Sequence, residues 1–330
     1  MPQWQGGAEP VYRFGAELLR WLAPAHDGLE ETVEIPAAGK QPLEIERGIK
    51  ARTVLLYQAR AARAAIERHQ PKRIVTLGGD CLIDLAPMAW LNRRYEGKLG
   101  VLWVDAHPDV MSAAEFSHAH SHVLGMLLGR GDEEFTAEVE RKLNPARVMI
   151  AGMNAWTQDE GRILQELGIR HTPAADIADS SQPILDWIKA EGIAHLAVHF
   201  DLDVLDAAHF SPLLFNKPDP PEGAFEGIVQ GTMRLGHAAA QGCAREPAHP
   251  AALIAATATG HCRATRPTPR RLTASVTLIW LKASLSASPG WQGFCIWLMS
   301  PLLVIVLVVE QHDVRALEPE SQSPVSVDRD

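Results

Sequence analysis

The sequence predicts an α/β fold of three layers, in which a mostly parallel β-sheet lies between helices. Short apolar segments alternate with segments of helical periodicity from residue 46 onward, an order typical of parallel sheets. Three of the apolar segments end directly in polar clusters, at the sheet edge where α/β proteins bind ligands. A chain of 330 residues has room for one large α/β domain or two modest ones, and we expect one domain over residues 1–235.

The first predicted elements are a helix, a strand and a second helix. Residues 46–70 are rich in Ala, Leu, Arg and Glu, place apolar residues at helical spacing and stop at Pro71, which predicts a long helix. The β-branched segment RIVTL, residues 73–77, predicts a strand that ends at two glycines. Residues 85–95 predict the helix that follows.

The same alternation continues to about residue 206. Strands are predicted in the apolar segments KLGVLWV (98–104), ARVMIAGMN (146–154) and IAHLAVHF (193–200), and helices in TQDEGRILQELG (157–168) and ILDWIKAEG (184–192). The carboxyl ends of parallel strands meet at one edge of the sheet, so the chemistry is expected there.

The chain changes character beyond about residue 235. Residues 236–293 show no sustained apolar period and are predicted to be irregular. The uninterrupted apolar run within 294–310 is shorter than the roughly 20 residues of a membrane-spanning helix. We therefore expect it to supply a buried strand near 302–310 that completes the domain, with a membrane anchor as the second interpretation. The acidic tail, 311–330, is predicted to be disordered.

Composition narrows the class of partner and the compartment. The chain has 40 acidic and 31 basic residues, a net charge of -9 and no cluster of Lys and Arg, so nucleic acid is not an expected partner. The cysteines are scattered without a CxxC pair, and the first thirty residues do not read as a signal peptide. These features predict a reduced, cytoplasmic setting, the alternative being a protein tethered to a membrane through 294–309.

The segment DAHPD places Asp105, His107 and Asp109 at alternate positions where a strand ends, so that in extended backbone all three side chains point to one side. The segment HFDLDVLD similarly places Asp201 and Asp203 on one face of another strand end. Neighbouring carboxylates repel one another, and a divalent cation would relieve that repulsion. Each segment alone also fits a solvated acidic loop, but together they favour a metal site.

The type of ligand indicates the type of ion. Four carboxylates and one imidazole form a hard, oxygen-rich set that suits Mn²⁺ better than a structural zinc centre, and two ions could share it. The third acid of the second segment, Asp206, is interpreted as a helix or turn cap.

With these motifs in order, the sequence resembles the ureohydrolase family of arginases, agmatinases and their relatives over about residues 1–235, whereas the C-terminal third does not match. The family motifs read here as GGDC, DAHPD, SHAHSHVLGMLLG and FDLDVLD. The resemblance implies a centre of two Mn²⁺ ions whose bridging hydroxide attacks the guanidinium carbon of a small guanidino substrate, giving urea and an amine. It also implies a homo-oligomer. The metal ligands that it implies are Asp105 and Asp201 as bridging ligands, His107, Asp109 and Asp203 as the others, and Cys81 in the first motif.

The family also uses a histidine after the second motif as a proton shuttle, and three candidates occur here. Counting back from LLG favours His120, counting forward from DAH favours His122, and His118 lies beside them. A histidine is suited to this role because its pKa lies near neutrality. Each of the three, taken alone, equally fits a satisfied surface residue.

Two features depart from the family pattern. The first is Cys81, which stands where the family has a histidine: a thiolate is a softer ligand that would favour Zn²⁺ or Fe²⁺ at that position. Cys81 could instead be a spectator thiol or a small packing residue. The second is the substrate-binding glutamate of the family, for which Glu310, directly after VLVV, is the candidate, although it fits an ordinary polar strand end equally well.

These departures leave two other functions open. The chain could be a catalytically impaired relative that binds a metal or a partner. It could also be a metal-dependent amidohydrolase of the deacetylase type, which has a related αβα fold but typically needs one metal.

Overall fold

The protein is described by a computed structural model that covers residues 1–23, 26–178 and 180–205 and the backbone of several short strands beyond them. The strands of the last group are β8 (Ala252–Thr259), β9 (Leu278–Lys282), β10 (Trp291–Gln292), β11 (Cys295–Met299), β12 (Leu302–Leu303) and β13 (Glu310–Gln311). Asp206 and the tail beyond residue 311 lie outside the described residues, so their predicted roles stay predictions.

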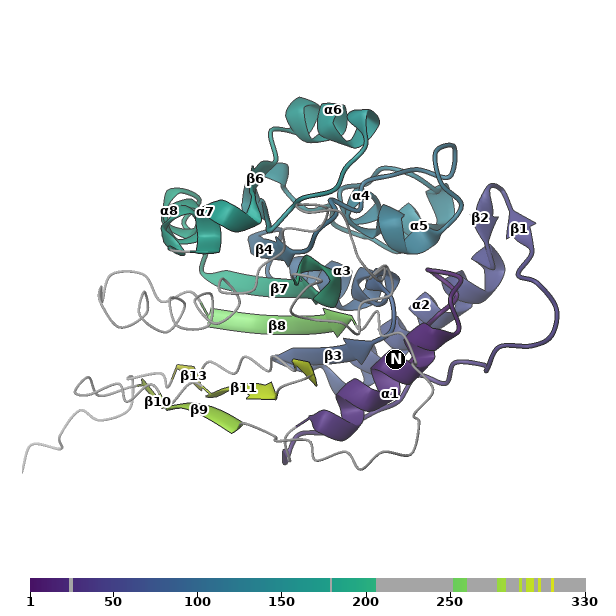
Figure 1. Ribbon diagram of the computed structural model, residues 1–330, viewed down its shortest axis with the longest axis horizontal. Coiled ribbons are helices and arrows are strands. Elements are labelled where there is room, and N and C mark those ends of the chain that lie inside the picture. Colours follow the sequence, from purple (N-terminus) through teal and green to yellow (C-terminus); the bar gives the residue numbers. More distant parts are fainter. Residues whose placement is uncertain are drawn as a thin grey trace, which may run out of the picture.

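A six-stranded parallel sheet forms the centre of the fold, in the order β3-β8-β7-β4-β5-β6. Figure 1 shows β8 between β3 and β7. The prediction of a mostly parallel sheet is therefore confirmed. The strands not yet given are β3 (Ile74–Gly78), β4 (Leu99–Val104), β5 (Val148–Ala151), β6 (Arg170–Thr172) and β7 (His195–Asp201).

Helices cover both faces of this sheet, which makes three layers. Alternate residues of β4 point to opposite faces: Val101 and Trp103 join the apolar cluster of the helices α2 and α3, whereas Leu102 and Val104 join the cluster of α7 and α8. The described helices are α1 (Val11–Leu22), α2 (Arg52–His69), α3 (Leu85–Arg94), α4 (Val123–Leu127), α5 (Glu133–Ala137), α6 (Gln158–Leu167), α7 (Ala174–Ala178) and α8 (Gln182–Ala190).

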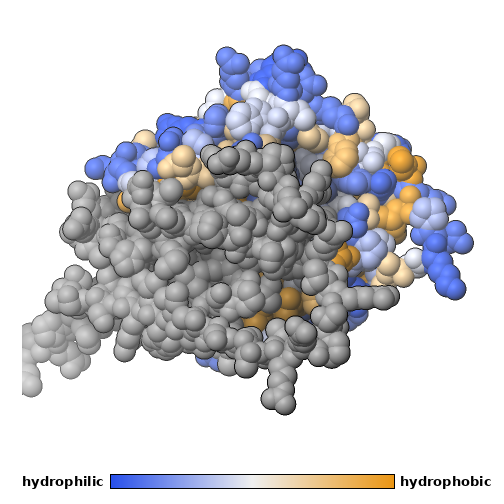
Figure 2. Space-filling view, in the orientation of Figure 1, coloured by the Kyte–Doolittle hydropathy of each residue, from blue (hydrophilic) through white to orange (hydrophobic). Residues whose placement is uncertain are grey.

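The helix α6 illustrates how the sequence produces one of these elements. Thr157 and Glu160 form a capping box that satisfies the first backbone N–H groups of the helix. Ile163 and Leu164 are buried on one side, while the surface at α6 is hydrophilic, as Figure 2 shows. The burial of one apolar face anchors the helix, in agreement with the prediction for residues 157–168.

The long helix predicted for 46–70 begins later than expected, at Arg52, and this correction has a local cause. Residues 45–46 and 49–50 form the antiparallel strands β1 (Ile45–Glu46) and β2 (Ile49–Lys50). The turn between them has positive φ at Arg47 and Gly48, +51° and +83°, which is the backbone of a tight two-residue hairpin. The hairpin takes the first residues of the helical pattern out of the helix.

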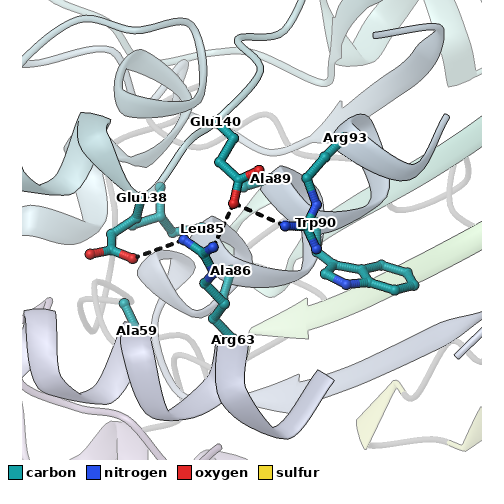
Figure 3. Close-up of a pocket in the computed structure, with 9 residues that line it drawn as sticks. All are labelled: Ala59, Arg63, Leu85, Ala86, Ala89, Trp90, Arg93, Glu138 and Glu140. Carbon is teal, nitrogen blue, oxygen red and sulfur yellow. Dashed lines mark hydrogen bonds and ion pairs between the residues drawn. The ribbon is translucent and has the colours of Figure 1, made fainter. Parts of the chain in front are cut away.

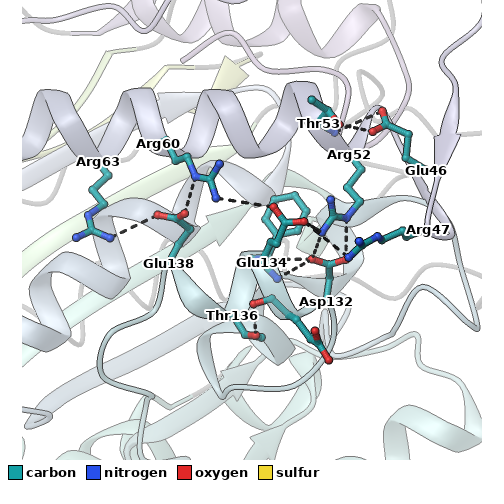
Figure 4. Close-up of polar contacts among 12 residues, drawn as sticks. Glu46, Arg47, Arg52, Thr53, Arg60, Arg63, Asp132, Glu134, Thr136 and Glu138 are labelled. Atoms are coloured by element: carbon teal, nitrogen blue, oxygen red, sulfur yellow. Dashed lines mark hydrogen bonds and ion pairs between the residues drawn. The ribbon is translucent and has the colours of Figure 1, made fainter.

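Ion pairs tie α2 to the start of α5, as Figure 4 shows. Arg52 donates to both carboxylate oxygens of Asp132, each at 2.8 Å, and both side chains are less than a tenth exposed. Asp132 in turn accepts from the backbone N–H groups of Glu134 and Phe135 and so caps α5. One buried ion pair thereby fixes the start of a helix that is only five residues long.

The C-terminal strands differ from the expectation for that region. Of the C-terminal strands, β8 joins the parallel sheet, although it lies in a segment that was expected to be irregular. The strands β12 and β13, in the region expected to complete the domain, pair instead with β11 and β10, outside this sheet. Among the described residues, no helix combines the length and the apolar character that crossing a membrane requires. The predicted division of the chain into domains stays a prediction.

Candidate metal centre

Three segments that carry predicted ligands meet at the carboxyl edge of the parallel sheet. Asp105 directly follows β4, Asp201 is the last residue of β7, and Cys81 follows β3 by three residues. The strand β7 lies beside β4 on one side and beside β8, the neighbour of β3, on the other. The fold thus brings GGDC, DAHPD and DLD to one edge, as the alternation of strands and helices predicts.

Gly79, directly before Asp80, allows the N-terminal segment to approach this edge closely. A Cβ atom at Gly79 would lie 2.1 Å from the carbonyl oxygen of Gln3 and 2.7 Å from that of Tyr12. Asp80 accepts hydrogen bonds from the backbone N–H groups of Gly6 and Leu82, at 3.0 and 3.1 Å. Asp80 therefore acts as a structural cap for the short 3-10 helix Cys81–Asp84 and positions Cys81.

A first group of potential ligands is buried below the sheet edge. Cys81, Asp105, His199 and Asp201 each offer one ligand atom, and these atoms all lie within 4.8 Å of one another. The thiol of Cys81 donates to the Oδ2 atom of Asp201 at 3.1 Å. We call this group the inner cluster. It contains three predicted ligands and one residue, His199, that was not predicted.

A second group shares Asp105 and lies nearer the surface. Asp105, His107 and Asp203 also have ligand atoms within 4.8 Å of one another. The Nδ1 atom of His107 lies 3.1 Å from Oδ2 of Asp203 and 3.5 Å from Oδ1 of Asp105. The side chain of His107 is 41% exposed. This group, the outer cluster, therefore faces solvent, and the inner cluster does not.

The remaining predicted ligand, Asp109, belongs to neither cluster in this geometry. Its backbone is left-handed, with φ of +50°, and its side chain is buried. The Oδ2 atom has no hydrogen-bond partner. Burial and the negative charge of Asp105 raise its pKa well above the ordinary value. A buried carboxylate oxygen without a partner fits a cation ligand, because leaving it bare costs free energy.

The electrostatics of the clusters also fit a divalent cation. Burial, followed by the charge of Asp201, raises the pKa of Asp203 to about 6. Burial and the charges of Asp109 and Asp201 raise the pKa of the Cys81 thiol. Burial would raise the pKa of Asp105 too, but hydrogen bonds with His107 and His199 outweigh it and lower that pKa. The carboxyl and thiol groups of the clusters thus lie so close together that several of them cannot be ionised at once, and a divalent ion would allow them to be.

The three candidate shuttle histidines lie beside the clusters but in neither of them. His122 is buried, its Nε2 atom lies 2.8 Å from the carbonyl oxygen of Phe116, and burial lowers its pKa to about 4. The Nε2 atom of His118 lies 2.7 Å from Nζ of Lys50. His120 is half-buried, with Nδ1 3.0 Å from the carbonyl oxygen of Gly6.

His120 contacts Tyr12, a residue of the N-terminal helix. Its ring contacts Tyr12 edge-on, with centroids 6.5 Å apart. Burial and the charge of Asp201 raise the pKa of Tyr12, so that ring lies within electrostatic reach of the inner cluster. The contact with Tyr12 thus links His120 to the surroundings of the inner cluster, and the choice of the shuttle histidine stays a prediction.

Glu310, the candidate substrate ligand, is in β13, which pairs with β10 rather than with the sheet that carries the clusters. Its side chain lies outside the described residues, so its role stays a prediction.

A depression lined by α2, α3 and the segment after α5 contains none of the cluster residues (Figure 3). Its charged groups are engaged with one another: Glu140 accepts from Arg93 at 2.9 Å and from Arg63, and Glu138 accepts from Arg63 at 3.4 Å. The acidic strand ends, not this depression, are therefore the candidate site.

The fold and the site together define a three-layer αβα protein whose carboxylate, histidine and cysteine side chains meet at the ends of parallel strands. The family model described as the Arginase family matches residues 13–212, more than half of the chain. The chain belongs to this family, and the resemblance predicted from the motifs is confirmed.

Individual relatives match over shorter regions. The chain is 30% identical to an arginase of Eremothecium gossypii over 156 residues, which is 44% of this chain and 38% of that protein. It is 28% identical to an arginase of Bacillus caldovelox over 165 residues, 47% of this chain and 54% of that protein. The aligned regions thus span about half or less of these relatives.

Solved structures support the fold. The Entamoeba histolytica arginase, crystallised in complex with L-ornithine, has a TM-score of 0.64 at 19% identity, covering 79% of this chain and 88% of that one. The Bacillus caldovelox arginase has a TM-score of 0.58 at 20% identity, covering 71% and 77%. At such identities the similarity shows the fold alone.

Proposed function

We propose that this chain is a metal-dependent hydrolase that cleaves a carbon–nitrogen bond of a small guanidino compound and releases urea and an amine. The observation that carries the proposal is the pair of ligand clusters that share Asp105 at the carboxyl edge of the sheet. Membership of the Arginase family supports the same reaction, a homo-oligomeric state and Mn²⁺ as the ion of the outer cluster.

The two clusters would each hold one metal ion. Asp105, His107 and Asp203 would hold one ion at the exposed side, and Cys81 and Asp201 would help to hold a second one beneath it, with Asp109 as a further carboxylate ligand. Bound divalent ions would supply Lewis acidity, which lowers the pKa of water and stabilises charge at the reacting carbon.

The difference in solvent exposure between the two clusters indicates the side from which a substrate would enter. His107 is the exposed member of the outer cluster, whereas the members of the inner cluster are buried. A substrate would therefore reach the site from the side of His107 and Asp203. On that side the buried carboxylates favour a cationic guanidinium group, and His120 would accept or return a proton.

The test is release of urea by the purified chain supplied with Mn²⁺, from arginine, agmatine and a series of guanidino acids. Turnover is expected for at least one of them and should be lost in Asp201→Asn. The matched control is Asp186→Asn, because Asp186 lies on α8 and pairs with Gln182 away from the clusters. A broad panel without turnover would refute the proposed reaction.

A catalytically impaired relative that binds metal is the second candidate, and the state of Cys81 favours it. The thiol is buried and donates to Asp201, and it stands where the family has a histidine, so the second ion would be held by a softer ligand than the family uses. Full metal occupancy without turnover would select this candidate. The deacetylase-type alternative needs one ion and would turn over an acetylated amine instead of a guanidino compound.

A further inference from the structure

The histidine that the motifs did not indicate, His199, lies in the middle of the inner cluster. It is on β7, two residues before Asp201, and therefore on the same face of the strand. Its side chain is 0% exposed. The Nε2 atom lies 3.2 Å from Oδ2 of Asp105, and the Nδ1 atom lies 2.6 Å from Oδ2 of Asp84. His199 thus bridges two buried carboxylates.

Two contacts fix the orientation of this imidazole ring. Trp103, the partner of His199 on the neighbouring strand β4, stacks on it with ring centroids 3.7 Å apart and an angle of 15° between the planes. Asp84 contacts Nδ1 at the edge of the same ring. Trp103 also donates from Nε1 to Asp105 at 3.0 Å, so ring and carboxylate are held in one arrangement.

Asp84 is placed as a partner for this histidine. It is the last residue of the short 3-10 helix that begins at Cys81, and it is fully buried. Its Oδ1 atom has no hydrogen-bond partner. A carboxylate on one nitrogen of a histidine fixes the tautomer in which the other nitrogen carries a lone pair, as behind many metal-binding histidines. In His199 that other nitrogen, Nε2, faces the inner cluster beside Asp105, and an ion bound there would take the place of the proton between the two side chains.

We propose that His199, oriented by Asp84, is a metal ligand of the inner cluster and supplies the imidazole that the first motif lacks because Cys81 stands there. With Cys81, Asp105 and Asp201 it gives one sulfur, one nitrogen and two oxygen ligands. Such a set suits a borderline-soft ion such as Zn²⁺, whereas the outer cluster offers only oxygen and nitrogen. The two positions would therefore prefer different ions.

The inference deepens the metal binding of the proposed function but does not depend on turnover. A chain that binds Zn²⁺ through His199 and releases no urea would refute the proposed reaction and leave the inference intact. The competing explanation of the same contacts is that His199 is always protonated, and that this imidazolium cation neutralises Asp84 and Asp105 in place of a metal. In that arrangement the inner cluster would bind no ion.

The experiment follows binding of Zn²⁺ and of Co²⁺ to the metal-free, full-length chain by isothermal titration calorimetry, elemental analysis and, for Co²⁺, absorption spectroscopy. His199→Gln should abolish binding at one position and remove the sulfur-to-cobalt charge-transfer absorption expected of Cys81. Asp84→Asn should weaken that position by about 10–100-fold, the effect typical of losing the partner of a ligating histidine.

The matched control is His195→Gln, because His195 is on the same strand but stacks on Tyr95, outside the clusters. This variant should bind as the original chain does. If His199→Gln retained both the number of ions and the charge-transfer absorption, the inference would be wrong.

A measurement on the unsubstituted chain keeps the inference falsifiable if His199→Gln does not fold. In a proton NMR spectrum of the Co²⁺-loaded protein, the ring N–H of a ligating His199 should give a resonance strongly shifted by the paramagnetic ion. This proton should exchange slowly with water, because the Nδ1–H of His199 is buried against Asp84. A ligating His107, which is 41% exposed, would exchange quickly instead. No slowly exchanging shifted resonance in the fully loaded protein would overturn the inference.

Discussion

Replacing Asp105 by Asn should abolish most of the stabilisation that divalent ions give this protein, because Asp105 is the ligand common to both clusters. The substitution keeps an oxygen that can accept the hydrogen bond from Trp103. An ion at a free concentration of about 100 times its Kd stabilises the folded state by about 2.7 kcal/mol at each position. For a domain of this size that corresponds to roughly 5–11 °C in Tm for each occupied position.

The assay is thermal unfolding of the metal-free chain and its variants with and without added Mn²⁺ and Zn²⁺. The original chain should gain stability from both positions, Asp203→Asn from the inner one only, and Asp105→Asn from neither. Asp186→Asn should behave as the original chain. If Asp105→Asn gained as much in Tm as Asp203→Asn, the clusters would not share a ligand and the reasoning would fail.

Three further predictions concern the scaffold around the site. Arg52→Ala should lower the free energy of unfolding by about 3–5 kcal/mol in a urea titration, because it leaves Asp132 buried without its positively charged partner, and an unchanged value would contradict this. Burial lowers the pKa of His122 to about 4, so its contribution to stability should fall as the pH drops from about 6.5 toward 4, and His122→Gln should remove that dependence. Gly79→Ala should destabilise the fold by about 1–3 kcal/mol and weaken metal binding, because the added methyl meets backbone atoms of Gln3 and Tyr12, and full metal affinity would argue against that packing.

Local spacing was sufficient to predict the central part of the fold and most of the clustered residues. DAHPD and DLD each keep their acids close in sequence at the end of a strand, so Asp105 and Asp201 reach the same edge through the general behaviour of parallel strands. The helix that starts at Arg52 rather than residue 46 shows the limit of periodicity, because a two-residue turn overrides it. The strand β8 was not predicted because its residues, ALIAATAT, carry few large apolar groups.

The remaining part of the site depends on contacts between distant segments. His199 looks in sequence like a polar interruption of the apolar strand HLAVHFD, and its partner Asp84 is 115 residues away. Only the pairing of β7 with β4 brings the ring against Trp103 and Asp105. In retrospect the one local signal was spacing, because His199 and Asp201 stand at alternate positions of one strand. For Asp109 the spacing misled in part, since a left-handed backbone removes it from the extended pattern.

The most direct test of the metal centre is anomalous diffraction from crystals of the protein soaked with Mn²⁺ and, separately, with Zn²⁺. We expect two anomalous peaks near the Asp105 carboxylate, one beside His107 and Asp203 and one beside Cys81, His199 and Asp201, with Zn²⁺ preferred at the second. A map with no peak at Asp105 under saturating metal would contradict a metal centre at these residues.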